Sequence, residues 1–173
     1  MTSALELRHF SHHDVPQIRQ TLIDVHADVY AAEMDEFNQR FPWFVDRWGG
    51  HPDFACVIAY DGDEVAGFAY GAPGAEGREW WREHVDPAPE MGRTFHFSEL
   101  MVRERWRKTG AAERLHRALI EARTEHLAAL LVDVAHPKVQ ALYEAWGYRK
   151  VGEGQPFPDS PVFAVMLLDL PLT

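Results

Sequence analysis

A short basic segment between a predicted strand and a predicted helix carries the residues with the most definite chemistry. It runs from Val102 to Ala112, and its basic members are Arg103, Arg105, Arg107 and Lys108. Small residues let main-chain amides approach a ligand closely, and a helix start presents unpaired N–H groups and the positive end of the helix dipole. A strand, a basic loop and a helix start in this order predict a phosphate site, and therefore a phosphate-bearing cofactor.

Two other interpretations of this segment are weaker. Basic residues on a solvated loop would bind nothing, but here a helix follows them directly. A phosphate loop of the Walker type needs Lys and then Ser or Thr after its last glycine, whereas Gly110 is followed by two alanines. The Gly-x-Gly-x-x-Gly pattern of dinucleotide-binding proteins does not occur in the sequence.

Hydrophobic periodicity and turn residues predict the elements that position this segment. The predicted strands cover residues 5–10, 54–60, 65–71, 95–102, 130–134, 148–151 and 162–170. The predicted helices run from a cap at Ser11 or Asp14 to about Tyr30, and over about 37–48, 79–82, 111–126 and 139–146, with Gly147 as the last stop signal. This order indicates an α/β (α+β) fold with a mixed, mostly antiparallel twisted sheet of about six to seven strands, flanked by helices.

Length and composition limit the class of protein. With 173 residues, 46% hydrophobic and 25% charged, the chain is expected to form a single domain over residues 1–173. Its formal net charge of -10 disfavours nucleic acid and anionic membranes as partners. No apolar run approaches the roughly 20 residues that span a bilayer, and no signal peptide is evident, so a cytoplasmic protein is expected.

Cysteine and histidine usage gives no sign of a metal site. Cys56 lies in an apolar run and is expected to be a small buried residue rather than a reactive thiol. The three histidines at 9, 12 and 13 match no metal-binding spacing, and solvated histidines at a strand–helix junction are the favoured interpretation. No metal is therefore expected.

Two segments in order resemble the GNAT superfamily of N-acetyltransferases. The family's cofactor signature, Gln/Arg-x-x-Gly-x-Gly/Ala between a strand and a helix, is matched by Arg107-Lys108-Thr109-Gly110-Ala111-Ala112. Its second signature is a strand and an Asn followed by a helix that ends in Leu-Tyr-x-x-x-Gly-Phe. The run Leu142-Tyr143-Glu144-Ala145-Trp146-Gly147-Tyr148 reproduces that helix closely. The two signatures cover residues 95–151, about a third of the chain, and are fairly specific together.

The resemblance implies that acetyl-CoA is the cosubstrate. In the family, coenzyme A lies where two parallel strands separate, here those at 95–102 and 130–134, with its diphosphate on main-chain amides. The implied cofactor-binding residues are Met101, Val102, Arg107, Lys108, Thr109, Gly110, Ala111, Ala112 and His136. The sequence departs from the family where His136 replaces the usual Asn, so that contact would need a histidine N–H donor. Glu104, in place of a common Pro, alters only the turn.

Acetyl transfer to an amine requires a base, an acid and an oxyanion donor. An alkyl ammonium of pKa near ~10.4 must lose a proton before it attacks a thioester. The family often draws the carboxylate base from the strand that here carries Glu99, where partial desolvation would raise its pKa; the alternative is a strand residue that faces solvent. Tyr143 resembles the family's general acid for the leaving thiolate, and equally fits a packed aromatic. An amide near Met101 or Val102 would stabilise the oxyanion.

The resemblance leaves the acceptor open. Acetylation of a primary amine of a small molecule is preferred, and the acidic net charge suits a cationic acceptor. The alternatives are a coenzyme A-binding module without transfer activity and acetylation of a protein N-terminus or lysine. Many relatives form dimers, so the resemblance is compatible with a homodimer, and the sequence leaves the oligomeric state open. Several aromatic residues either line an acceptor pocket or, more in keeping with their spacing, pack in the core: Phe41, Trp43, Phe44, Trp48, Trp80 and Trp81.

Overall fold

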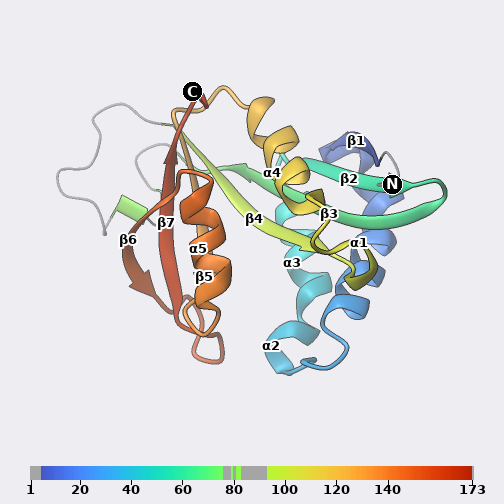
Figure 1. The fold of residues 1–173 in the computed structure, drawn as a ribbon, viewed down its shortest axis with the longest axis horizontal. Coiled ribbons are helices and arrows are strands. Elements are labelled where there is room, and N and C mark those ends of the chain that lie inside the picture. The colour runs from blue at the N-terminus through green and yellow to red at the C-terminus, as the bar shows by residue number, and fades with distance from the viewer. Residues whose placement is uncertain (1–4, 76–78, 80, 83–92, 173) are drawn as a thin grey trace. The chain divides into compact units, whose positions relative to one another are not determined.

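The computed structural model of the chain describes residues 5–75, 79, 81–82 and 93–172. Within these residues, seven strands form one sheet in the order β1-β2-β3-β4-β5-β7-β6 (Figure 1). The strands are β1 (Glu6–Ser11), β2 (Ala55–Asp61), β3 (Glu64–Pro73), β4 (Thr94–Val102), β5 (Leu127–Asp133), β6 (Arg149–Gly154) and β7 (Phe163–Asp169). The helices are η1 (His12–Asp14), α1 (Val15–Val29), α2 (Glu36–Gln39), α3 (Phe41–Gly49), η3 (Glu104–Trp106), α4 (Ala111–Glu121) and α5 (Pro137–Ala145).

The strand directions confirm the predicted mixed sheet with flanking helices. β4 pairs with β5 in parallel from Thr94–Leu127 to His96–Ala129. Four other neighbouring pairs, β1–β2, β2–β3, β5–β7 and β6–β7, are antiparallel. Of the described helices, none is both long and apolar enough to cross a membrane.

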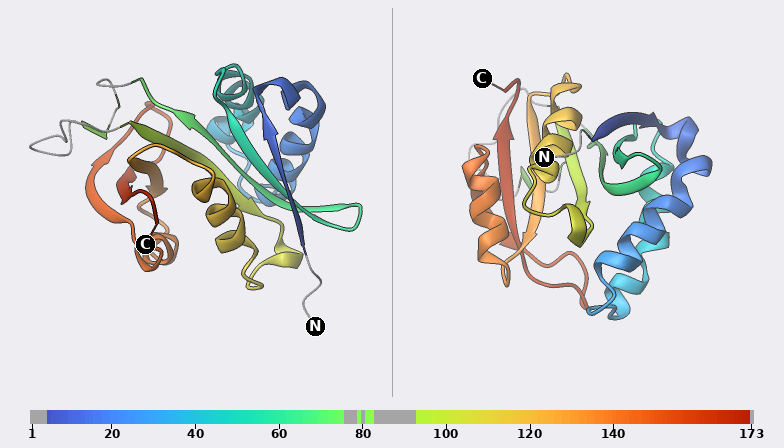
Figure 2. Two further views of the ribbon diagram at one scale, coloured as in Figure 1. Left: turned by 90° about the horizontal axis from the view of Figure 1, so that it is seen from above. Right: turned by 45° about the vertical axis from the view of Figure 1, so that its right-hand side comes forward.

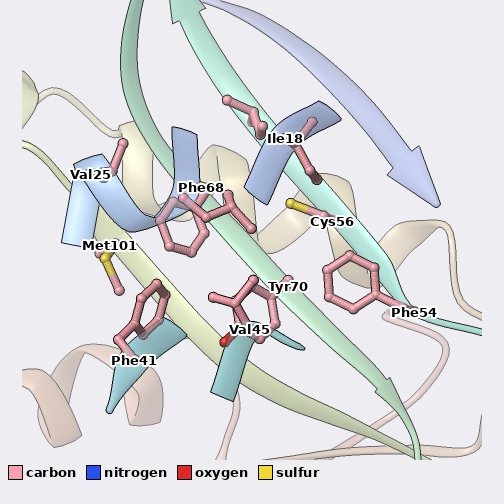
Figure 3. Close-up of a cluster of buried hydrophobic side chains, with 11 residues drawn as sticks. Ile18, Val25, Phe41, Val45, Phe54, Cys56, Phe68, Tyr70 and Met101 are labelled. Atoms are coloured by element: carbon pink, nitrogen blue, oxygen red, sulfur yellow. The ribbon is translucent and has the colours of Figure 1, made fainter. Parts of the chain in front are cut away.

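The chain divides into two compact units, and the first comprises residues 1–72 and 98–122. Here α1 and α3 cover one face of β2 and β3, and the cluster between them includes residues from all these elements and from β4 (Figures 2 and 3). Cys56 and Ile58 of β2 point into this cluster, whereas Val57 and Ala59 are equally buried on the opposite face, where α4 packs. Strand alternation explains the two buried faces. The prediction that Cys56 is a small buried residue is confirmed.

The second unit comprises residues 73–97 and 123–173. Its core joins Trp81 to inward-facing residues of β5 and β7, namely Leu127, Ala129, Val165 and Leu167. The Trp81 side chain is fully buried, and its indole N–H donates to the Thr94 hydroxyl at 2.8 Å. In this unit α5 lies alongside β5 (Figures 1 and 2). Gly147, with φ of +106°, ends α5 as the sequence predicts.

Three predicted boundaries need correction. The helix predicted over 111–126 ends at Glu121, because the amides of His126 and Leu127 donate to the carbonyl of Arg93 and start β5 three residues before the predicted 130. The segment 37–48 forms two helices, α2 and α3, with Pro42 in the first turn of α3. The helix predicted at 79–82 lies partly outside the described residues, which include 3₁₀ conformation at residues 81 and 82.

Candidate active site

The predicted cofactor loop follows β4 and is anchored in the first unit. After Val102 the chain forms η3, whose Trp106 is buried and donates its indole N–H to Asp61 at 2.9 Å. Arg105 lies over the Trp106 ring and pairs with Glu64 at 2.7 Å. Asp61 and Glu64 flank the turn of the β2–β3 hairpin. The hairpin turn therefore fixes where the loop leaves the sheet.

Two of the four basic residues of this segment are bound to other residues of the protein, and the other two can contact a ligand. Arg103 pairs with Asp28 at 3.0 Å and donates to the Val65 carbonyl at 3.1 Å, and Arg105 is bound to Glu64. Arg107 donates its Nε–H to the Val102 carbonyl at 3.1 Å, which leaves the two terminal nitrogens of an exposed side chain. Lys108 is also exposed. Arg107 and Lys108 are therefore the basic residues of the segment that could bind an anion, whereas Arg103 and Arg105 are engaged in ion pairs within the protein.

The backbone between Lys108 and Ala112 has the shape that a phosphate cradle needs. Lys108 and Gly110 both have left-handed backbone, with φ of +62° and +85°. Gly110 is the N-cap of α4, so the amides of Ala111 and Ala112 are among the four at a helix start that have no partner within the helix. The loop is exposed at Lys108, Thr109 and Gly110. These features fit the diphosphate of an acyl-CoA.

Gly110→Ala is expected to lower the free energy of unfolding by about 1–2 kcal/mol, because an L residue resists left-handed backbone. Nothing lies within 4 Å of the added Cβ, so the cost is conformational rather than steric. Relaxation of φ would turn the neighbouring amides away and weaken acetyl-CoA binding. Urea unfolding and calorimetry measure the two effects.

Gly62→Ala is the matched control for this variant. Gly62 also has positive φ, +61°, with nothing within 4 Å, but it lies in the β2–β3 turn. Both variants should lose similar stability, and Gly110→Ala should lose the larger part of its affinity for acetyl-CoA, because Gly62 acts on the loop only through the Asp61 and Glu64 contacts. Equal affinity in the two would contradict the placement of the cradle at Gly110.

Glu99 lies in the part of β4 that belongs to the first unit, and its side chain is partly buried. Burial raises the pKa of Glu99 to about 8. Met101, two residues on, joins the cluster between α1, α3 and the sheet (Figure 3). The neighbouring Gly67 of β3 is needed there, since a Cβ would lie 2.3 Å from the Met101 carbonyl oxygen. A carboxyl group with this pKa accepts a proton readily near neutral pH.

Tyr143 and His136 belong to the second unit. Tyr143 is buried on α5 and contacts Trp146 and Tyr148 edge-to-face, with ring centroids 5.2 and 5.5 Å away. His136 is the N-cap of α5, and its half-exposed ring lies 3.7 Å from the Asp133 carboxylate. That carboxylate also accepts from the Ala135 amide at 2.8 Å and so shapes the turn from β5 to α5. An exposed histidine N–H at this turn is available to a ligand.

Sequence reasoning missed one residue, and the packing that it favoured for the aromatic residues is found for Phe41 and Trp81. Phe41 is buried in the core of the first unit, as Trp81 is in that of the second, so both pack; Trp43 is half-exposed, and Trp80 lies outside the described residues. The missed residue is Tyr70 of β3, which is fully buried with a hydroxyl that has no hydrogen-bond partner among the described residues. A tyrosine inside an apolar strand was the available signal, because a buried phenol needs a partner.

Comparison with known proteins identifies the fold. The family model described as "Acetyltransferase (GNAT) family" matches residues 17–148. NAA60 from Arabidopsis thaliana in complex with acetyl-CoA superposes with a TM-score of 0.70 at 16% identity, over 96% of this chain and 100% of that chain. Ard1 from Thermoplasma volcanium gives 0.65 at 16% identity, over 98% and 99% of the two chains. A GNAT-family acetyltransferase from Bacillus cereus gives 0.64 at 12% identity, over 96% and 97%. No curated protein matches the sequence significantly.

Proposed function

Because the chain belongs to the GNAT acetyltransferase family, we propose that it is an N-acetyltransferase that moves an acetyl group from acetyl-CoA to a primary amine of a small molecule. The observation that carries the proposal is Glu99, a desolvated carboxyl group on the strand that leads into the cofactor loop. With a pKa of about 8, the ionised form of Glu99 is a stronger proton acceptor than an ordinary carboxylate, and its population rises with pH.

The cofactor loop would hold acetyl-CoA through its diphosphate. The amides from Lys108 to Ala112 would donate to the phosphate oxygens, and Arg107 and Lys108 would add charge-assisted hydrogen bonds. Thr109 would contribute through its amide, because its hydroxyl already donates to the Trp106 carbonyl. His136 would supply an N–H donor in place of the family's asparagine. When bound, acetyl-CoA supplies an activated carbonyl carbon.

The chain's own residues would then transfer the protons of the reaction and stabilise the negative charge that develops on the carbonyl oxygen. Glu99 takes a proton from the acceptor ammonium, directly or through water, so that the nitrogen lone pair can form the new C–N bond. An amide near Met101 or Val102 donates to the carbonyl oxygen as negative charge develops there. Tyr143 would donate its hydroxyl proton to the sulfur as the C–S bond breaks, which would release the thiol. The second proton lost by the nitrogen as the amide forms would restore the Tyr143 hydroxyl.

The acceptor class rests on charge, and the alternatives remain testable. A net charge of -10 favours approach of a cationic amine. NAA60 was also solved with a bisubstrate analogue, and the NatC complex with Gag peptide and CoA, so a peptide acceptor is the second candidate for this fold. A coenzyme A-binding module without transfer activity is the third. The single domain and the cytoplasmic location stay predictions, and a homodimer stays compatible with the resemblance.

Release of free thiol from acetyl-CoA tests the proposal. The protein is incubated with acetyl-CoA and a panel of small primary amines, polyamines and aminoglycosides, with peptides carrying free N-termini or lysines as a second panel. Amine-dependent thiol release with the first panel supports the proposal, and release with peptides alone moves the acceptor to protein. Tight binding of acetyl-CoA without release in either panel would favour the binding module.

A further inference from the structure

The hydroxyl group of Tyr70 has no role in the packing that surrounds it. Its side chain is fully buried in β3, stacked on Phe68 with ring centroids 5.9 Å apart (Figure 3). Phe54 lies 5.4 Å and Trp48 6.4 Å from the same ring. No side chain or main-chain group among the described residues meets the criteria for a hydrogen bond to the Tyr70 Oη atom. Phenylalanine would fill this site equally well, so the hydroxyl requires a different explanation.

The position of Tyr70 along β3 places it beside Glu99. The Arg103 amide donates to the Ala66 carbonyl at 2.8 Å, which fixes the register of the two strands at this point. Glu99 lies four residues before Arg103, and Tyr70 lies four residues after Ala66, so the same register places these two residues opposite each other. The hydrogen bond between the Gly74 amide and the Thr94 carbonyl, 2.9 Å, would instead place Ser98 opposite Tyr70, so the register shifts by one residue between these two bonds. Met101 lies in the same cluster as Tyr70, and Glu99, two residues before Met101 on the same strand, therefore lies on the face of the sheet that Tyr70 occupies.

The electrostatics of the phenol agree with this placement. Burial raises the pKa of Tyr70 well above its usual range, and the charge of Glu99 raises it further. The Ser98 side chain also lies near the phenol, and its hydrogen-bonding interaction lowers the pKa of Tyr70. Tyr70 therefore keeps its proton at every pH at which the protein would work, and can act as a donor.

Other titratable groups around this cluster do not compete for that proton. The ring of His26 stacks on Phe41 at 3.9 Å, and burial lowers the pKa of His26 to about 4, so it is neutral at pH 7. Cys56, opposite Tyr70 in the β2–β3 register, is a buried thiol whose pKa burial raises. Of the charged groups on the elements packed here, Arg103 pairs with Asp28 and Arg19 with Asp46. Asp24 accepts a hydrogen bond from Gln20, and Arg47 lies over the Trp43 ring.

We propose that Tyr70 is a positioning residue for Glu99, to whose ionised carboxylate its hydroxyl donates a hydrogen bond, directly or through one water molecule. Hydrogen bonds to an ionised acceptor are roughly twice as strong as those to a neutral one, so the contact favours the form of Glu99 that accepts a proton. It also fixes the direction in which the carboxylate faces. The role of Glu99 as base rests on the proposed function, whereas the contact itself does not.

Titration of Glu99 in the full chain without acetyl-CoA tests the contact. Protein labelled with ¹³C at glutamate side-chain carboxyls is titrated by NMR, and Glu99→Gln assigns the Glu99 signal. Its midpoint is expected to lie about one pH unit higher in Tyr70→Phe, which has lost the donor, than in the parent protein. Tyr60→Phe is the matched control, because Tyr60 lies on β2 of the same sheet and interacts with Arg8 instead. It should leave the midpoint unchanged.

An unchanged Glu99 midpoint in Tyr70→Phe overturns the inference. Should that variant not fold, replacement of tyrosine by 3-fluorotyrosine gives the opposite test: a more acidic phenol donates more strongly and should lower the midpoint, and no change again overturns the inference. A shifted midpoint without acetylation of any amine leaves the contact standing and the proposed function wrong. If the protein acetylates an amine but the Glu99 midpoint is the same with and without the Tyr70 hydroxyl, the proposed function stands and this inference is wrong.

Discussion

Glu99→Gln is expected to lower kcat by about 10²–10⁴-fold while the affinity for acetyl-CoA stays nearly unchanged. The amide cannot accept a proton from the acceptor ammonium, yet it has almost the same size and hydrogen-bonding reach as the carboxyl group. The cofactor is expected to bind instead at the loop between Arg107 and Ala112. Steady-state kinetics with the best amine from the panel, together with calorimetry of acetyl-CoA binding, separate the two effects.

The pH dependence gives this prediction a second readout. A base works in its ionised form, so kcat/KM of the parent protein should rise with pH through an apparent pKa of about 8 and fall away below it. In Glu99→Gln, kcat/KM should no longer rise with pH in this range. Glu104→Gln changes an exposed glutamate just after the same strand and should keep both the rate and the rise with pH. If Glu99→Gln retains the parent turnover and pH profile, another group is the base.

Tyr143→Phe is expected to lower kcat by about 10²-fold, which is the lower end of what a general acid contributes. A coenzyme A thiolate resembles a cysteine thiolate of pKa about 8.5, so it can leave without full protonation, and loss of the acid is less damaging than loss of the base. The phenyl ring keeps the edge-to-face packing with Trp146 and Tyr148. Stability and acetyl-CoA affinity should therefore change little.

Tyr148→Phe is the matched control for Tyr143→Phe. Tyr148 is equally buried, its ring lies 5.5 Å from that of Tyr143, and burial raises its pKa well above the usual range. Both variants lose one phenolic hydroxyl from the same aromatic group in the second unit. Comparable rates in the two would assign Tyr143 to packing and remove it from the proposed chemistry.

Local signals predicted most of the elements. Apolar runs on either side of a turn with Gly62 mark β2 and β3, and Gly147 marks the end of α5, because these signals act through a few neighbouring residues. The end of α4 was wrong by five residues since it depends on Arg93, whose carbonyl claims the amides of His126 and Leu127. Such a pairing joins residues more than thirty positions apart, and no local pattern encodes it.

The candidate site was only partly predictable for the same reason. The motif from Arg107 to Ala112 is contiguous, and the left-handed backbone at Gly110 follows from its residue type. The use of Arg103 and Arg105 in ion pairs depends on Asp28 and Glu64, which are distant in the chain. Tyr70 could be linked to the site only from the structure, because the pairing of β3 with β4 is not encoded in a local sequence pattern.

The attachment of Trp106 to Asp61 has a practical consequence for anyone who changes this protein. Residues at the tip of a surface hairpin usually tolerate replacement, and library designers choose them for that reason. In this chain the residues at this turn hold the segment for which we propose phosphate binding. A substitution at Asp61 or Glu64 is therefore expected to alter acetyl-CoA affinity, although neither residue is among the proposed ligand contacts. Randomised libraries should leave both positions fixed, or vary them deliberately to change the affinity for acetyl-CoA from a distance.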